Sequence, residues 1–255
     1  MHLHLPEIDE FAHLNSPIYS WDARVKIVSL LCLIISIVLL DKILPALLGF
    51  AFCVILVFIS RIPLRFLFAY LRWALLFSLF FVIIMPLTVE GNEIAKFYFL
   101  SISRDGIELG ILIALRAISA VILIFPMVAT SKFAVTMKAL QSLKIPDKLI
   151  QMVMFSYRYI FIFTEEIERM FTAAKARAFQ EKTNLHTLRT VGFILGMLFV
   201  RSYERARRVY DAMLARGYTG NLKILHEFNL CRKDLVKGFI IIVVAVLLQV
   251  ISYLL

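Results

Sequence analysis

The carboxylates that could act as general acids or bases gather at Glu165, Glu166 and Glu168. Such chemistry needs side chains that converge in a partly dry pocket, where one carboxyl can hold a proton. Arg169 follows Glu165 by four residues, a spacing that favours an ion pair on the surface of one helix. We therefore interpret these carboxylates as a solvated helix face and not as a catalytic group.

Metal ligands and nucleophiles are present, but they do not complete a site. Three histidines lie near the N-terminus, His2, His4 and His13, and no carboxylate or thiol at ligand spacing joins them. The three cysteines form no C-x-x-C pair. The sequence has no glycine-rich phosphate loop and no nucleophile elbow. We expect no catalytic residue, no metal ligand and no cofactor in this chain.

Two arginines have a setting suited to recognition, because each stands between small residues at the expected end of a long helix. The triplets are Ala176-Arg177-Ala178 and Ala215-Arg216-Gly217. A guanidinium there can enter a partner's acidic groove with forked hydrogen bonds, and the small neighbours allow close approach. For either triplet alone, complementing the helix dipole is the simpler explanation. Their occurrence on consecutive helices favours instead a pair of contacts with a partner protein.

The helices that carry these triplets are long. No glycine or proline occurs from residue 147 to about residue 181, and a second helix is expected over 186–216, closed by Gly217. Residues 149–163 and 191–200 are mostly apolar, with Arg158 as their one charged residue, whereas 165–182 and 201–216 are rich in charge. These apolar stretches are short for a bilayer span. We expect the helices to lie along or dip into the inner face of the membrane, although the sequence leaves spanning open.

Gly192 and Gly196 form a G-x-x-x-G pattern on the second long helix. Small residues four positions apart let two helix backbones approach closely. We predict that the first long helix crosses the second at these glycines, with accidental spacing as the alternative.

Membrane helices are the elements that must position these groups. Hydrophobic residues make up 61% of the chain and the mean hydropathy is +0.86, far more than a soluble core requires. A span takes about 20 apolar residues. The apolar runs that approach this length cover residues 27–40, 43–60, 73–89, 107–129 and 238–255.

The predicted fold is therefore all-α: a polytopic membrane protein with about five transmembrane helices and two to three long coupling helices in the cytosol or on the inner face. We divide the chain into four parts. They are a cytosolic segment (1–26), transmembrane helices 1–4 (27–130), a cytosolic coupling-helix domain (131–237) and a C-terminal transmembrane helix (238–255).

Loop charges predict the orientation of this fold. Residues 61–72 hold three arginines and no acid, whereas 90–105 hold three acids and two bases. Positive loops stay in the cytosol, so we expect a cytosolic N-terminus and an external C-terminus. The same rule accounts for the formal charge of +10, so we expect no nucleic-acid partner.

The paired triplets resemble the two Ala-Arg-Gly motifs of the transmembrane T component of energy-coupling factor (ECF) transporters. Asp22-Ala-Arg-Val-Lys26 is similar to that family's Asp-Pro-Arg-x-Lys segment before the first span. Residues 157–160 and 165–169 resemble its first long coupling helix. The opening residues 8–17 resemble the cobalt and nickel branch, the CbiQ type. The resemblance covers nearly the whole chain.

Two positions depart from the family pattern. Ala178 stands where the family commonly has glycine, so we expect the first long helix to run on toward Asn184 and to present Arg177 less freely than Arg216. Ala23 replaces the proline of the N-terminal segment.

The resemblance implies a scaffold in the cell membrane that joins two cytosolic ABC ATPases to a small substrate-binding membrane (S) subunit. ATP closes the ATPases, the coupling helices move, and the S subunit reorients to release substrate inside. This chain would itself catalyse nothing. Cobalt is the first substrate to expect, then nickel, then a vitamin.

Two other classes of protein remain as alternatives. A membrane-bound transferase should show ionisable residues converging inside its spans, and only Glu108 and Arg116 are candidates. The permease of a conventional ABC transporter needs its own substrate pathway, and these spans are very apolar for one.

Overall fold

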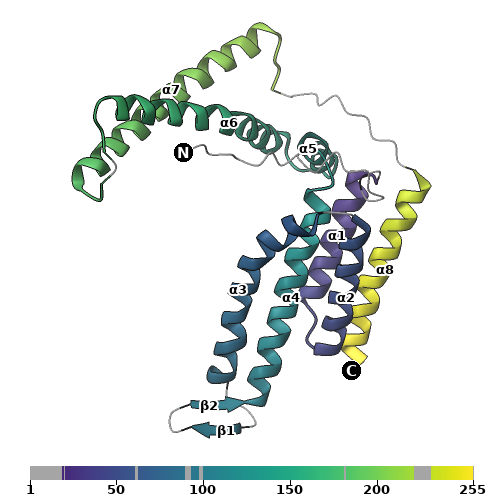
Figure 1. Ribbon diagram of the computed structural model, residues 1–255. Coiled ribbons are helices and arrows are strands. Elements are labelled where there is room, and N and C mark those ends of the chain that lie inside the picture. The colour runs from purple at the N-terminus through teal and green to yellow at the C-terminus, as the bar shows by residue number, and fades with distance from the viewer. Residues whose placement is uncertain are drawn as a thin grey trace. The chain divides into compact units, whose positions relative to one another are not determined.

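A computed structural model describes residues 19, 21–60, 63–89, 93–97, 100–180, 182–220 and 231–254. Apart from two short strands, the regular structure of these residues is helical (Figure 1). The helices are α1 (Ala23–Val38), α2 (Ile43–Ser60), α3 (Leu64–Thr88), α4 (Arg104–Val128), α5 (Phe133–Ser142), α6 (Asp147–Ala176), α7 (Leu185–Ala215) and α8 (Arg232–Leu254). The three N-terminal histidines and the opening segment 8–17 lie outside the described residues.

The chain folds as two units. The first holds the described residues up to Ala139 together with α8, and the second holds residues 140–220 with α6 and α7. Helix α5 crosses the division. We call the first the membrane unit and the second the lever unit.

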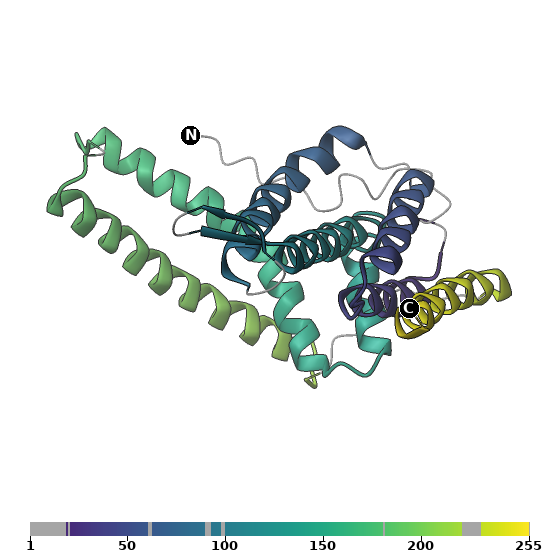
Figure 2. The ribbon, with the colours of Figure 1, turned by 90° about the horizontal axis from the view of Figure 1, so that it is seen from below.

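Helices α1 and α8 lie side by side in the membrane unit and run in the same direction (Figures 1 and 2). Hydrogen bonds mark the start, middle and end of this seam: Trp21 Nε1 to the Asp234 carbonyl (3.1 Å), Ser36 Oγ to the Ala245 carbonyl (2.7 Å) and the Asp41 amide to Ser252 Oγ (3.3 Å). Helix α1 has 16 residues, fewer than a typical span, yet it accompanies α8 along the bundle.

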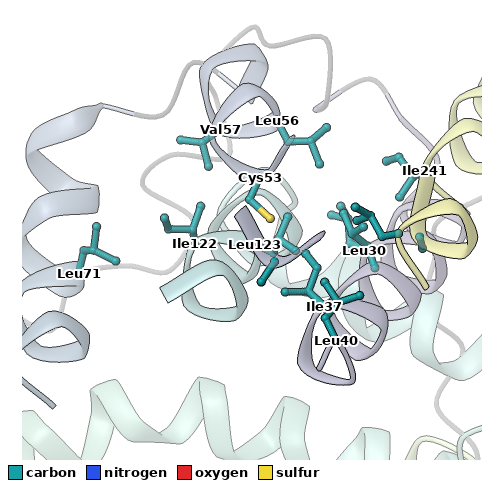
Figure 3. Close-up of a cluster of buried hydrophobic side chains, with 14 of the residues drawn as sticks. Leu30, Ile37, Leu40, Cys53, Leu56, Val57, Leu71, Ile122, Leu123 and Ile241 are labelled. Carbon is teal, nitrogen blue, oxygen red and sulfur yellow. The ribbon is translucent and has the colours of Figure 1, made fainter. Parts of the chain in front are cut away.

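Helix α4 packs against α1, α2 and α3 and carries the centre of the unit. Its Leu123 is fully buried with Leu33 and Ile37 of α1 and with Cys53 of α2. Figure 3 shows the Cys53 side chain within this cluster of apolar side chains. The described cysteines form no disulfide.

The outer surface of the membrane unit is apolar. By length and composition, α2, α4, α8 and residues 71–88 of α3 could each cross a membrane, and at most 39% of any of these spans is buried within the protein. Large side chains such as Phe58, Trp73 and Phe77 are more than 60% exposed. Only lipid or an apolar partner can cover so much surface, so this is a multi-pass membrane protein.

The helices extend beyond the apolar runs from which we predicted them. Helix α3 begins before the predicted residue 73 and α8 before the predicted residue 238. Residues predicted as a polar loop form an antiparallel pair of strands, β1 (Glu93–Phe97) and β2 (Leu100–Ser103). Hydropathy marks only the part of a helix that lipid covers, so it misses helical turns outside the bilayer.

The close approach of α1 and α8 at Gly238 yields a stability prediction. A Cβ at this position would lie 2.3 Å from Val25 Cγ1. We expect Gly238→Ala to destabilise the purified chain by about 1–3 kcal/mol, the usual cost of overpacking. Adding Val25→Ala should restore much of the loss in thermal unfolding.

Gly192→Ala is the matched control, because a Cβ there meets nothing within 4 Å. Its effect should be small and stabilising, since alanine favours helix more than glycine does. A Gly238→Ala protein as stable as the wild type would contradict the described packing of α1 on α8.

Candidate coupling site

The lever unit is an antiparallel pair of long helices. Helix α6 has 30 residues and α7 has 31. Both ends of α7 match the predicted second helix to within one residue. The Asn184 side chain caps α7 by accepting a hydrogen bond from the Thr187 amide at 2.9 Å. Pro146 stands at the N-cap of α6, and Gln141 Nε2 donates to the Asp147 carboxylate at 2.9 Å.

Glu166 of α6 lies opposite two arginines of α7. Its Oε1 accepts a hydrogen bond from Arg201, and its Oε2 lies 3.5 Å from Arg205 Nη2. The hydrogen bond from Arg201 is the main cause that lowers the pKa of the Glu166 carboxyl; burial opposes the shift, and the charges of Arg201, Arg169 and Arg205 add to it. Glu165, by contrast, forms the predicted exposed pair with Arg169, at 3.1 Å.

A second contact joins the other end of the pair. Tyr218 Oη donates to Gln151 Oε1 at 2.6 Å, and Gln151 Nε2 donates to the Gly220 carbonyl at 3.0 Å. The chain that follows α7 is therefore bound to the first turns of α6. Arg177 at the end of α6 and Arg216 at the end of α7 thus lie at opposite ends of the pair.

Helix α6 ends at Ala176, and our prediction that it runs on toward Asn184 was wrong. Ala178 adopts a left-handed conformation with φ of +63°. The Phe179 amide donates to the Ala174 carbonyl at 3.1 Å, and the Ala178 amide to Lys175 at 3.0 Å. This pattern of helix termination satisfies carbonyls that the helix would otherwise leave without partners.

Helix α7 ends in the same way. Gly217 has φ of +80°, and the Tyr218 amide donates to the Met213 carbonyl at 3.0 Å. Arg177 and Arg216 hold the same place at the two helix ends, with φ of −94° in both, and both side chains are exposed. The prediction that Arg177 is presented less freely was therefore wrong. A left-handed alanine costs only about 1–2 kcal/mol, which the cap and the return of the chain to α7 can offset.

The end of α6 borders a cavity of 510 Å³ within the lever unit. Its lining combines methionine and phenylalanine side chains with the proposed coupling arginine: Met170, Arg177, Phe179, Phe193 and Met197. Sequence reasoning did not identify this cavity, because its walls come from both helices and from the turn between them. The surface beside Arg177 is thus hollow, and it mixes apolar side chains with polar ones such as His186 and Arg201.

Gly192 and Gly196 do not lie at the crossing of the two helices. A Cβ at either position would meet nothing within 4 Å. The closest described tie between α6 and α7 is instead the ion pair of Glu166 with Arg201. The predicted helix crossing at these glycines is corrected accordingly, and their side of α7 is open.

The ionisable residues of α4 do not converge. Glu108 lies 3.4 Å from Arg104 on its own helix, whereas Arg116 reaches Asp41 in the α1–α2 turn at 3.1 Å. Within the described residues, no group of three His, Cys, Asp or Glu side chains could hold a metal ion.

Comparison with known proteins identifies the class as the transmembrane component of ECF transporters. The chain belongs to the CbiQ family, because the family model described as a cobalt transport protein matches residues 15–226.

Relatives whose names state a role in transport support this assignment. The ECF transporter transmembrane protein EcfT of Staphylococcus aureus is 27% identical over 260 residues, covering 96% of this chain and 97% of the relative. EcfT of Bacillus subtilis is 28% identical over 84% of both chains. The cobalt transport protein CbiQ of Rhodobacter capsulatus is 28% identical over 74% of both chains.

The ends of α6 and α7 yield a prediction: two substitutions should change local stability in opposite directions. Ala178→Gly should stabilise the end of α6 and Gly217→Ala should destabilise the end of α7, each by about 1 kcal/mol, because a Cβ strains a left-handed residue. Hydrogen exchange of the Phe179 and Tyr218 amides measures the two ends separately. Ala173→Gly in the interior of α6 is the control and should destabilise. Faster exchange of Phe179 in Ala178→Gly would refute the described cap.

The ion pair of Glu166 yields a pH prediction. A carboxyl whose pKa is lowered by folding stabilises the fold above its unfolded pKa, and that contribution is lost as the pH falls through the folded value. We expect the contact between α6 and α7 to loosen below pH 4.5, the ordinary value for this group. Distances between spin labels at Thr172 and Leu195, with the native cysteines replaced, would report it.

Glu166→Gln should remove most of this pH dependence and loosen the contact at neutral pH. Glu165→Gln is the matched control, because it removes the same charge from an exposed pair within one helix. If both variants behaved alike, the pair between α6 and α7 would not be what holds them together.

Proposed function

We propose that this chain is the scaffold of an ATP-driven ECF importer, linking two cytosolic ABC ATPases to a substrate-binding membrane subunit. The observation that carries the proposal is the equivalence of Arg177 and Arg216. Both are exposed, both cap the C-terminal end of a long helix, and both precede a left-handed residue. Two identical contacts suit two copies of one type of ATPase.

The separation of the two arginines fits this role. The 30 residues of α6 rise about 45 Å at 1.5 Å each. Contacts at opposite ends of such a pair can engage two subunits at once. Closure of the ATPases on ATP then moves both ends of one rigid lever, and the lever transmits the movement to the membrane.

The loop charges support the proposed orientation. Residues 61–72 carry three arginines and no acid, which supports a cytosolic location for the α2–α3 connection. The N-terminus is then cytosolic and the C-terminus external. The apolar stretches 149–163 and 191–200 lie against the inner face of the membrane, where lipid and the S subunit cover them.

Cobalt is the proposed substrate, and nickel the next. The family description and the relative from Rhodobacter capsulatus both name cobalt transport, which supports this choice. In this proposal metal selection belongs to the S subunit, which binds the substrate. ATP hydrolysis likewise belongs to the partner ATPases.

A conventional ABC permease is the second candidate. It would require a polar pathway through the membrane unit. Arg116 and Glu108 pair with separate neighbours instead of lining a common path, which disfavours this reading and that of a membrane transferase.

The two arginines provide the test of the scaffold. Truncating one partner of a buried charge pair typically costs about 2–5 kcal/mol. Because two contacts on one body reinforce each other, we expect Arg177→Ala and Arg216→Ala to weaken ATPase binding similarly and moderately, and the double variant to abolish it. Co-purification and substrate uptake would measure both effects.

Arg208→Ala is the control, because Arg208 is exposed on α7 and forms a weak pair with Glu204 at 4.0 Å. It should bind the ATPases normally. A double variant at positions 177 and 216 that assembled and transported like the wild type would show that these arginines only complement the helix dipoles.

A further inference from the structure

Lys26 is the most unusual charged residue of the membrane unit. It lies in the first turn of α1, and its side chain is completely buried. Its ammonium donates hydrogen bonds to Thr130 Oγ1, at 2.9 Å, and to Ser131 Oγ. The described partners of this buried cation are therefore neutral hydroxyls.

Burying an ammonium among neutral groups is costly, since hydroxyls replace only part of its hydration. A leucine or methionine would fill the same space without that cost. Packing alone thus does not account for a lysine here. The hydrogen bonds to the two hydroxyls are what distinguishes it from an apolar side chain.

The two hydroxyls belong to the turn between α4 and α5. Helix α4 ends at Val128 with Ala129 as its cap, and α5 begins at Phe133. Thr130 and Ser131 are buried in that turn. Thr130 Oγ1 also donates to the Pro126 carbonyl at 2.6 Å. Lys26, Thr130 and the last turn of α4 therefore form one hydrogen-bonded chain.

Pro126 weakens the end of α4 beside this turn. Proline has no amide hydrogen, so the last turns of α4 lack one of the hydrogen bonds that would stabilise them. The contact from α1 supplies a fixed point from outside the helix. Without it, the connection would be held by the local bond of Thr130 and by backbone bonds such as that of the Ala129 amide to the Phe125 carbonyl, at 2.8 Å.

We propose that Lys26 is a positioning residue that latches the α4–α5 turn to α1. Helix α5 is the route by which the chain passes from the membrane unit into the lever unit. The latch keeps the root of the lever fixed, so that movement of α6 and α7 is passed to the membrane helices and is not absorbed by unwinding of the turn. This role in transport rests on the proposed function, whereas the latch itself does not.

Hydrogen exchange on the purified chain tests the latch independently of transport. Lys26→Met keeps the length of the side chain and removes its donors. We expect amides in residues 127–136 to exchange at least about tenfold faster, because hydrogen bonds to charged groups are among the stronger ones. Exchange in residues 149–176 should not change. Lys132→Met is the matched control, since Lys132 is exposed in the same turn.

A double-mutant cycle tests whether the effect passes through the hydroxyl contact. Once Ser131→Ala has removed one acceptor, the further loss on Lys26→Met should be smaller than in the wild type. Fully additive effects, or wild-type exchange in Lys26→Met, would overturn the latch. If Lys26→Met did not fold, Ser131→Ala and Thr130→Val against the Lys132→Met control would carry the same measurement.

The assembled transporter tests the consequence. We expect a complex that contains Lys26→Met to assemble and its ATPases to hydrolyse ATP normally, but the complex to take up several-fold less substrate per ATP hydrolysed. A change in exchange with an unchanged ratio of uptake to hydrolysis would reduce Lys26 to a stabilising role and overturn its part in coupling. Failure of the arginine variants to affect assembly would instead count against the proposed function and leave the exchange result intact.

Discussion

The membrane unit depends on one constraint: it cannot bury its own apolar surface. Most residues of its spans face outward, and lipid must solvate them. The hydrophobic effect therefore drives insertion and does little to select one helix pairing over another. That selection falls to close packing at residues such as Gly238 and to the few polar groups that tie helices together. The seam between α1 and α8 shows both, with a close approach at Gly238 and hydrogen bonds at each end.

The lever unit is organised by polar contacts at a few points. The charge pair of Glu166 fixes where α6 meets α7, and the contact of Gln151 with Tyr218 returns the chain to the start of α6. The helix ends are held by left-handed caps, at Lys144, Ala178 and Gly217 for α5, α6 and α7. In the proposed scaffold, such fixed points would keep a force at one end of the helix pair from being lost in bending.

Much of this could be predicted from the sequence. Apolar runs and breaker residues located the membrane helices and both ends of α7. The end of α6 could not be predicted, because the expected cost of a left-handed alanine ignored the tertiary contacts that draw the chain back toward α7. The hydrogen-bond and ion-pair partners of Lys26 and Glu166 could not be predicted from the sequence either. Both residues are far from their partners in the sequence, and the spacing of apolar and polar residues along one helix does not indicate contacts with a distant segment. The glycines of α7 show the reverse case, in which a recognised pattern has no partner within the described chain.

The pairing of Arg116 with Asp41 has a consequence for the surrounding bilayer. Residues 104–116 of α4 rise about 18 Å before the helix reaches the α1–α2 turn. Helix α1, with 16 residues, is about 24 Å long, and α4, with 25, about 38 Å. A bilayer of uniform thickness near 30 Å cannot match both. Lipid beside the α1–α2 turn must thin or tilt so that headgroups reach the exposed Asp41. Membranes with longer acyl chains would therefore strain the side of the protein at the α1–α2 turn before the side at α4.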